Sequence, residues 1–253
     1  MKIRIFLYKF KIYFLKNMPI VKIVYKSYNI KRKRKVFLGR SNADIFSEIY
    51  DRKLWGKKPE NISDFYSGTG SCGKPVEDYV NCINTFILDN KISSITDVGC
   101  GDFFVGGKIT SCDPSLNYVG CDVVPELISR NREKFGSTNV KFEFLDASAD
   151  PLPQSQLLTI RQVLQHLSNA DIKAILNKSK GFPYVIITEH QYKKGLEKSF
   201  NKDKPSGPDI RLVEFSGVYL DKEPFNLEAT EILRCREDSN GKEAHIVSYL
   251  IIN

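Results

Sequence analysis

The sequence has six cysteines among its 253 residues but no Cys-x-x-Cys pair. Pairs at that spacing often hold structural zinc, so we expect no metal centre. Cys100 and Cys121 lie at the ends of apolar runs that predict buried strands, where a free cysteine acts as a small hydrophobic side chain. We therefore expect no disulfides, and the cysteine pattern indicates a reducing, cytoplasmic environment.

Long apolar runs are also missing. A membrane-spanning helix needs about 20 predominantly apolar residues, and lysines interrupt every apolar stretch near the N-terminus before it reaches that length. The same region has neither the continuous apolar core nor the small-residue cleavage site of a signal peptide. We expect neither a membrane span nor a secretory signal.

Acidic side chains are absent from residues 1–38, which hold twelve lysines and arginines. The other residues hold 26 of the 38 Lys and Arg against all 30 Asp and Glu, so the formal net charge of +8 comes from this basic arm. Overall charge is therefore a poor argument for a nucleic-acid partner. The length and the 42% hydrophobic content fit one globular α/β domain behind the arm.

The arm, expected over residues 1–40, mixes its cations with apolar residues at helical spacing. The residues of that apolar face are Ile3, Phe6, Leu7, Phe10, Tyr13 and Phe14. This pattern favours a peripheral contact of residues 1–38 with an anionic membrane surface. It also fits a helix packed on the body with solvated lysines, and the basic run 31–35 could contact RNA phosphates.

A glycine turn is the first sign of a ligand site. Residues 92–98 are apolar and rich in β-branched side chains, which predicts a buried strand that ends at Gly99-Cys100-Gly101. The two glycines would let the backbone turn sharply and approach a ligand. A helix is predicted to open at residue 104 with its first N–H groups toward that ligand.

Two more strands follow, and an acid stands at the end of each. One apolar run ends in Asp122, about 20 residues after the turn, where nucleotide-binding α/β units place a ribose-binding carboxylate. Residues 140–145 predict a third strand, followed by Asp146 and Ala147. With Asp97 in the first strand, three strand ends carry carboxylates.

These elements resemble the class I S-adenosylmethionine-dependent methyltransferases over residues 60–253. The stretch from Asp97 to Gly101 is similar to the first motif of that family. A dinucleotide fingerprint would need a third glycine where this chain has Phe104. Asp97 would fix the turn or the cofactor amine, or cap nearby backbone N–H groups.

The resemblance implies S-adenosylmethionine as the cofactor. Asp122 would accept its ribose hydroxyls, and Asp146 with Ala147 would contact its adenine. Gly99 and Gly101 would bring backbone N–H groups to its carboxylate end.

The expected fold is α/β and Rossmann-like, in one domain over residues 41–253. It has a seven-stranded, mostly parallel sheet with a C-terminal antiparallel hairpin, preceded by the basic helical arm. Asn240-Gly241 marks the hairpin turn. The further helices are expected over residues 41–60, 76–88, 126–135 and 169–180, and the further strands over 157–161, 184–188, 227–236 and 244–252.

Residues 191–226 break the alternation of strands and helices and predict an insertion on the substrate side of the sheet. Asp209 and Arg211 could bind the acceptor there, or pair with each other. The glycine-rich loop 66–73 could be a linker or a lid over the cofactor, with Tyr66 as a candidate substrate contact.

The candidate catalytic residues follow the fourth and fifth strands. His166 is the first choice as general base, with Glu189 and His190 in reserve. An unperturbed imidazole titrates near ~6.5, so we expect turnover to fall below about pH 6.5. His166→Ala should lower it by about two orders of magnitude or more.

The run from Arg161 to Leu167 is similar to that of family members acting on small molecules, including bacterial surface sugars. The resemblance implies O-methylation of a saccharide or another polar small molecule, in the cytoplasm or at the inner face of the plasma membrane. No Asn-Pro-Pro-aromatic motif follows the fourth strand, so DNA is not expected as the substrate, and a nucleic-acid partner is not favoured. A non-catalytic cofactor-binding module and an RNA methyltransferase remain as alternatives.

The basic arm gives a direct prediction. The full-length protein should sediment with anionic liposomes and be released as salt screens its cations. A protein that starts at Ser41 is the control and should stay in the supernatant. Equal pelleting of the two proteins would contradict a membrane role for the arm.

Overall fold

The computed structural model describes residues 34–56, 65–193, 195–237 and 244–253. The chain divides into two compact units, Met1–Arg40 and Ser41–Asn253. The described part of the first unit contains a short 3-10 helix, Lys35–Phe37. The amphipathic face expected in the arm and the Asn-Gly turn of the hairpin lie outside the described residues.

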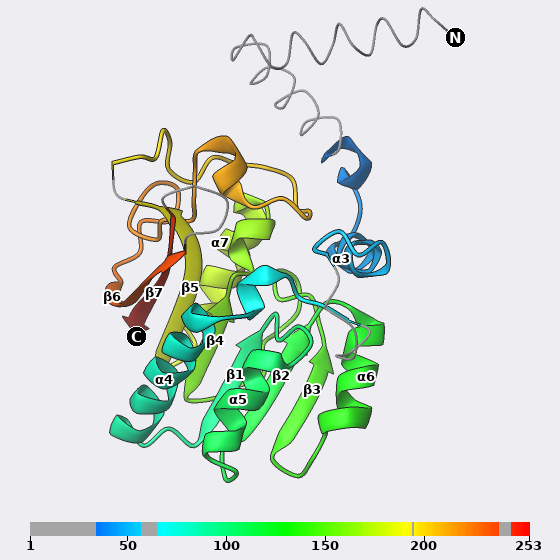
Figure 1. Cartoon of the computed structure of the whole chain (residues 1–253), viewed down its shortest axis with the longest axis vertical. Coiled ribbons are helices and arrows are strands. Elements are labelled where there is room, and N and C mark those ends of the chain that lie inside the picture. The colour runs from blue at the N-terminus through cyan, green and yellow to red at the C-terminus, as the bar shows by residue number, and fades with distance from the viewer. Residues whose placement is uncertain (1–33, 57–64, 194, 238–243) are drawn as a thin grey trace, which may run out of the picture. The chain divides into compact units, whose positions relative to one another are not determined.

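A seven-stranded sheet forms the centre of the second unit (Figure 1). Its order is β3-β2-β1-β4-β5-β7-β6; the first five strands in sequence run parallel, and β7 is antiparallel to both β5 and β6. The fold expectation is therefore confirmed. The strands are β1 Ser94–Val98, β2 Asn117–Asp122, β3 Val140–Phe144, β4 Leu157–Arg161, β5 Tyr184–Tyr192, β6 Thr230–Glu237 and β7 Ala244–Ile252.

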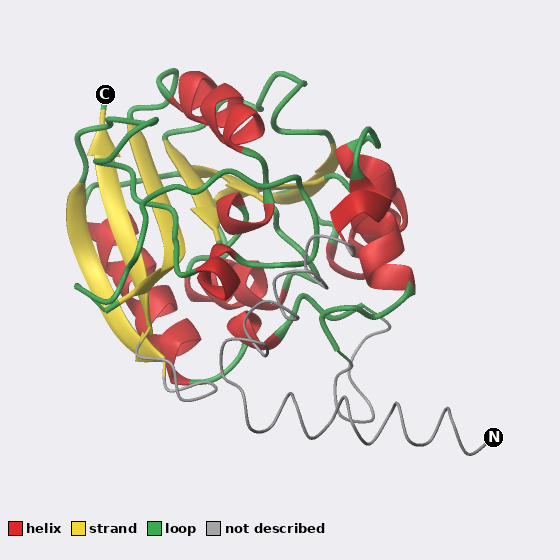
Figure 2. Cartoon of the chain, turned by 90° about the horizontal axis from the view of Figure 1, so that it is seen from above, coloured by secondary structure: helices red, strands yellow, loops and turns green. Residues whose placement is uncertain are grey.

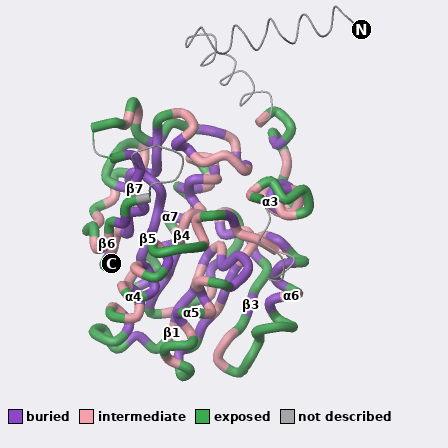
Figure 3. The backbone as a smooth tube through the Cα atoms, viewed as in Figure 1, coloured by how far each residue is buried: buried purple, intermediate pink, exposed green. Residues whose placement is uncertain are grey.

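Helices cover both faces of this sheet (Figure 2), so the central strands are buried along their length (Figure 3). Ser41 and Ser168 cap two of the helices by accepting backbone N–H groups. The first of these helices ends at Asp51, well before the expected residue 60. The helices are α3 Asn42–Asp51, α4 Lys74–Asp89, α5 Phe104–Cys112, α6 Pro125–Phe135 and α7 Asn169–Ser179.

Strand β5 extends four residues beyond the expected end at residue 188. Because β7 is itself nine residues long, pairing continues and places Glu189 opposite Val247 and His190 opposite Ile246. These two candidate residues therefore lie inside a strand and not in a loop after it.

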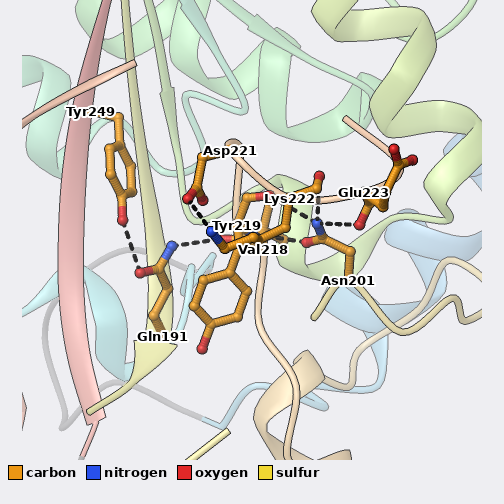
Figure 4. A network of polar contacts seen from close by, with 8 residues as sticks. All are labelled: Gln191, Asn201, Val218, Tyr219, Asp221, Lys222, Glu223 and Tyr249. Carbon is orange, nitrogen blue, oxygen red and sulfur yellow. Dashed lines mark hydrogen bonds and ion pairs between the residues drawn. The ribbon is translucent and has the colours of Figure 1, made fainter. Parts of the chain in front are cut away.

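A buried asparagine organises the insertion after β5 (Figure 4). Asn201 donates its side-chain amide to the carbonyls of Tyr219, Lys222 and Glu223, at 2.8, 3.2 and 2.9 Å. Its Oδ1 accepts the backbone N–H of Tyr219 at 2.8 Å. One side chain thus joins the start of the insertion to its end.

A second amide connects the insertion to the sheet. Gln191 of β5 donates to the carbonyl of Val218 at 2.6 Å and accepts from the Tyr249 hydroxyl at 3.0 Å (Figure 4). Side-chain amides thus connect the insertion both to itself and to the sheet.

Asn201→Ala should lower the free energy of unfolding by about 3 kcal/mol, because it leaves several buried backbone groups without partners. Asn226→Ala is the matched control. Both asparagines have a left-handed φ, +47° and +48°, but the Asn226 amide makes one exposed bond, to the Glu223 carboxylate. Urea unfolding should show a loss of about 1 kcal/mol or less for the control. Equal losses would mean that backbone conformation matters and the buried bonds do not.

Candidate active site

A pocket opens at the carboxyl ends of the parallel strands. The six candidate cofactor residues all line it, although they come from three strands and the loops after them. They are Asp97, Gly99, Gly101, Asp122, Asp146 and Ala147.

The turn after β1 requires its glycines for two reasons. Gly99 and Gly101 have φ of +74° and +55°, which side chains other than glycine rarely adopt. A Cβ on Gly99 would lie 2.2 Å from the Val163 side chain, and one on Gly101 would lie 2.4 Å from Ser67 Oγ. The glycines therefore let two distant segments pack onto the turn.

Each backbone N–H of residues 99–104 already has an acceptor within the protein. The acceptors are the Cys121 carbonyl for Gly99 and Cys100, the Asp122 carboxylate for Gly101, Ser67 Oγ for Asp102, the Cys100 carbonyl for Phe103, and the Asp102 carboxylate for Phe104. The expectation that Gly99 and Gly101 present N–H groups to a ligand is corrected. The turn lets a ligand approach the backbone closely, but other groups must donate hydrogen bonds to that ligand.

Asp97 and Asp122 have different surroundings although both are partly buried. Asp97 accepts the Tyr118 hydroxyl at 2.5 Å and the Thr159 hydroxyl at 2.8 Å, so it joins β1 to both neighbouring strands. Asp122 accepts only backbone N–H groups, from Gly101 at 3.1 Å and from Val124 at 3.2 Å. Burial raises the pKa of Asp122 to about 6, against the effect of these N–H groups. Each oxygen of both carboxylates therefore keeps a lone pair, but Asp97 is held by the side chains of two neighbouring strands, whereas the hydrogen bonds of Asp122 come from the backbone alone.

Helix α3 closes the pocket near β3. Asn42 donates its amide to Asp146 Oδ2 at 3.0 Å, while Ser148 donates its backbone N–H and its hydroxyl to Asp146 Oδ1. The Tyr50 hydroxyl lies 3.1 Å from Ser67 Oγ, the same atom that accepts the Asp102 N–H. Asn42, Tyr50 and Ser67 line the pocket and were not expected from the sequence.

The loop 66–73 lies against the turn through Ser67, but Tyr66 itself does not line the pocket. A Cβ on Gly56 would lie 3.6 Å from the Tyr66 ring, so that side chain packs beside the segment after α3.

His166 lines the pocket, and its ring centroid lies 5.1 Å from that of Trp55. Trp55 donates its indole N–H to the Pro208 carbonyl at 3.2 Å, so the insertion and the segment after α3 meet beside His166. Burial, with a smaller contribution from the charge of Lys204, lowers the pKa of His166 to about 3. With this pKa the imidazole is neutral near pH 6.5, so its titration does not support the expected fall of turnover at that pH.

The two reserve candidates do not line the pocket. Glu189 accepts the backbone N–H groups of Leu164 at 2.8 Å and Gln165 at 3.1 Å, and thereby fixes the loop that carries His166. Burial raises its pKa to about 8. His190 is buried within β5. Glu189 is consequently placed to position the loop and not to touch a substrate.

Arg211 and Asp209 are also absent from the pocket lining. The Arg211 guanidinium is buried and donates to the carbonyls of Lys202 and Leu167, the latter at 2.8 Å. The expected substrate contact of Arg211 is corrected: its charge ties the insertion to the loop after β4.

No family model matches the sequence, and no curated protein matches it. Solved structures do match. The N-methyltransferase NodS from Bradyrhizobium japonicum, in complex with S-adenosyl-L-homocysteine, is 12% identical with a TM-score of 0.54, over 83% of this chain and 98% of NodS. Human N-acetylserotonin methyltransferase, in complex with SAM, is 11% identical with a TM-score of 0.50, over 93% of this chain and 68% of that one. The chain has the fold of these methyltransferases.

The described residues include no helix with the length and apolar character needed to cross a membrane. They also contain no group of three or more His, Cys, Asp or Glu side chains that could hold a metal ion.

Glu189→Gln should lower the free energy of unfolding by about 1–3 kcal/mol at pH 6, because the new amide group opposes a buried N–H of Leu164 or Gln165. The pKa of Glu189 is raised, so the stabilisation from its protonated form is fully present below about pH 4.5. It is lost as pH rises through about 8. The difference in the free energy of unfolding between the wild type and the variant should therefore decrease from pH 6 to pH 9.

Denaturant unfolding at several pH values measures this difference. Glu143→Gln, at an exposed position of β3, is the control and should be neutral throughout. A difference in the free energy of unfolding that increases with pH would contradict the role of a protonated Glu189 in fixing the loop.

Proposed function

We propose that this protein is an S-adenosylmethionine-dependent methyltransferase that methylates a hydroxyl group of a saccharide or another polar small molecule. The observation that carries the proposal is the order of acceptors along the pocket. Asp146 follows β3, Asp122 ends β2, and the glycine turn follows β1. These are neighbouring strands of the sheet, so an adenosine could place its base and its ribose on consecutive acids.

The pocket residues suit such a cofactor. Asp122 can accept two ribose hydroxyls, because each carboxylate oxygen has lone pairs beyond the one used by the backbone. Asp146, held by Asn42 and Ser148, can accept an adenine amino group. A Cβ at Gly99 would clash with the Val163 side chain and one at Gly101 with Ser67 Oγ, so only glycine fits at these two points of the pocket wall.

The cofactor supplies a methyl group that is already activated as a sulfonium, so the protein mainly has to position the acceptor. Trp55 and His166 are pocket residues that lie beside the insertion, because Trp55 donates to the Pro208 carbonyl and its ring lies 5.1 Å from that of His166. The neutral imidazole can accept a hydrogen bond from a hydroxyl and orient it. Its pKa of about 3 makes it a weak base, so we assign His166 a positioning role first.

The decisive experiment is product detection. The purified protein is incubated with S-adenosylmethionine and a panel of glycans and small alcohols, and a mass gain of one methyl group is sought by mass spectrometry. Glycans from cells with and without the protein provide the natural acceptor. Cofactor binding without transfer to any acceptor would favour the non-catalytic alternative.

Asp122→Asn should weaken S-adenosylhomocysteine binding by about 10- to 100-fold, because a charged acceptor is replaced by a neutral one. Asp89→Asn, at the exposed end of α4, is the control. The pKa of Asp122 is about 6 in the free protein. As pH drops through 6, Asp122 should lose its negative charge and the wild-type protein should lose affinity for S-adenosylhomocysteine. The Asp122→Asn variant should bind this ligand equally from pH 5 to 7.5. Calorimetry measures both effects, and an unchanged affinity in the variant would remove Asp122 from the site.

A further inference from the structure

Arg161, the last residue of β4, is a cation that lines the pocket. It has no role in the proposed binding of adenine and ribose. Its guanidinium makes one hydrogen bond, from Nη2 to the Gly70 carbonyl at 2.9 Å, and lies 5.1 Å from the centre of the Tyr79 ring. Its Nε is buried and has no partner. Burial lowers the pKa of Arg161, with Tyr79 and Asp97 acting in the opposite direction.

Arg161 is partly buried, and a cation withdrawn from water normally has a carboxylate partner, because removing its charge from water is costly. No ion pair joins Arg161 to any described carboxylate: Asp97 accepts the Tyr118 and Thr159 hydroxyls, and Glu189 accepts two backbone N–H groups. Arg161 is also the one lysine or arginine among the described residues that line the pocket. An anionic ligand group would complete its coordination.

The glycine turn cannot bind that group instead. Every backbone N–H from residue 99 to residue 104 is already donated within the protein. A second donor without a partner does lie next to Arg161, because the side-chain nitrogen Nε2 of Gln162 is buried and unpaired and the residue lines the pocket. The free donors of the pocket floor therefore gather after β4.

The order of the strands identifies the ligand group. Asp146, Asp122, the glycine turn and Arg161 lie at the ends of β3, β2, β1 and β4, which are adjacent in that order. S-adenosylmethionine is a linear molecule with adenine at one end, ribose next to it, and a single carboxylate in the amino-acid part at the other end. With adenine at Asp146 and ribose at Asp122, the carboxylate reaches the β4 end of the pocket.

We propose that Arg161 binds the carboxylate of the cofactor's amino-acid part, with Gln162 as a second donor. This assignment rests on the proposed function. Arginine suits the task because its planar guanidinium can donate two parallel hydrogen bonds to one carboxylate, and such bonds are strong where water is excluded. In this proposal the carboxylate is bound by the side chain of Arg161 at the end of β4, and not by the backbone of the turn after β1.

Three ligands test the proposal by calorimetry: S-adenosylmethionine, its decarboxylated analogue, and 5'-methylthioadenosine, which lacks the whole amino-acid part. The wild-type protein should bind S-adenosylmethionine about 10- to 100-fold more tightly than the decarboxylated analogue. In Arg161→Gln this preference should shrink to about threefold or less, while the affinity for 5'-methylthioadenosine stays within about threefold of wild type.

Arg132→Gln is the matched control, because Arg132 also donates to one backbone carbonyl, that of Phe142, but does not line the pocket. It should keep the full preference. Arg161→Lys retains the charge without the planar pair of donors and should keep part of the preference, so it serves as the second variant if Arg161→Gln unfolds.

Three results would overturn the assignment. Equal weakening of all three ligands in Arg161→Gln and Arg161→Lys would mean that Arg161 only supports Gly70 and Tyr79. An intact preference in both would mean that the carboxylate binds elsewhere. An intact preference together with lost transfer to acidic acceptors alone would mean that Arg161 binds the acceptor. In contrast, a wild-type protein that binds none of the three ligands would overturn the proposed function itself.

Discussion

The hydrogen bonds that close the turn between β1 and α5 are the constraint on which the site depends. Three segments far apart in the sequence supply acceptors to this turn: the end of β2, the Ser67 hydroxyl and the turn itself. Positive φ angles at Gly99, Gly101 and Phe103 allow the backbone to reach them. The same bonds orient Asp122 and hold the loop that carries Ser67 over the pocket.

Because the turn uses its own donors, side chains must provide the charges of the pocket. Four acids line the pocket, Asp97, Asp102, Asp122 and Asp146, and one arginine, Arg161, lies at the end of β4. Burial lowers the pKa of His166 to about 3, and Trp55 lies beside its ring. In the proposed binding mode, the ribose hydroxyls face Asp122 and the carboxylate of the zwitterionic amino-acid part faces Arg161.

The strands and the strand-end acids could be predicted from the sequence, because apolar runs and their terminal residues are local signals. The roles of Glu189 and Arg211 could not be. The end of β5 depends on its pairing with β7, about 60 residues away in the chain, and this pairing turns Glu189 toward the backbone of Leu164 and Gln165. Likewise Asn42 and Ser67 acquire their roles only when distant segments meet at the pocket, and no local pattern marks such meetings.

The most direct test of the account is a crystal structure of the protein with S-adenosylhomocysteine. The account predicts that both ribose hydroxyls lie within hydrogen-bond distance of the Asp122 carboxylate, and that the adenine lies beside Asp146 and Ala147. The turn from Gly99 should keep its internal hydrogen bonds when the ligand is bound. A ligand that binds in the reverse direction, or outside the pocket at the ends of β1 to β4, would contradict it.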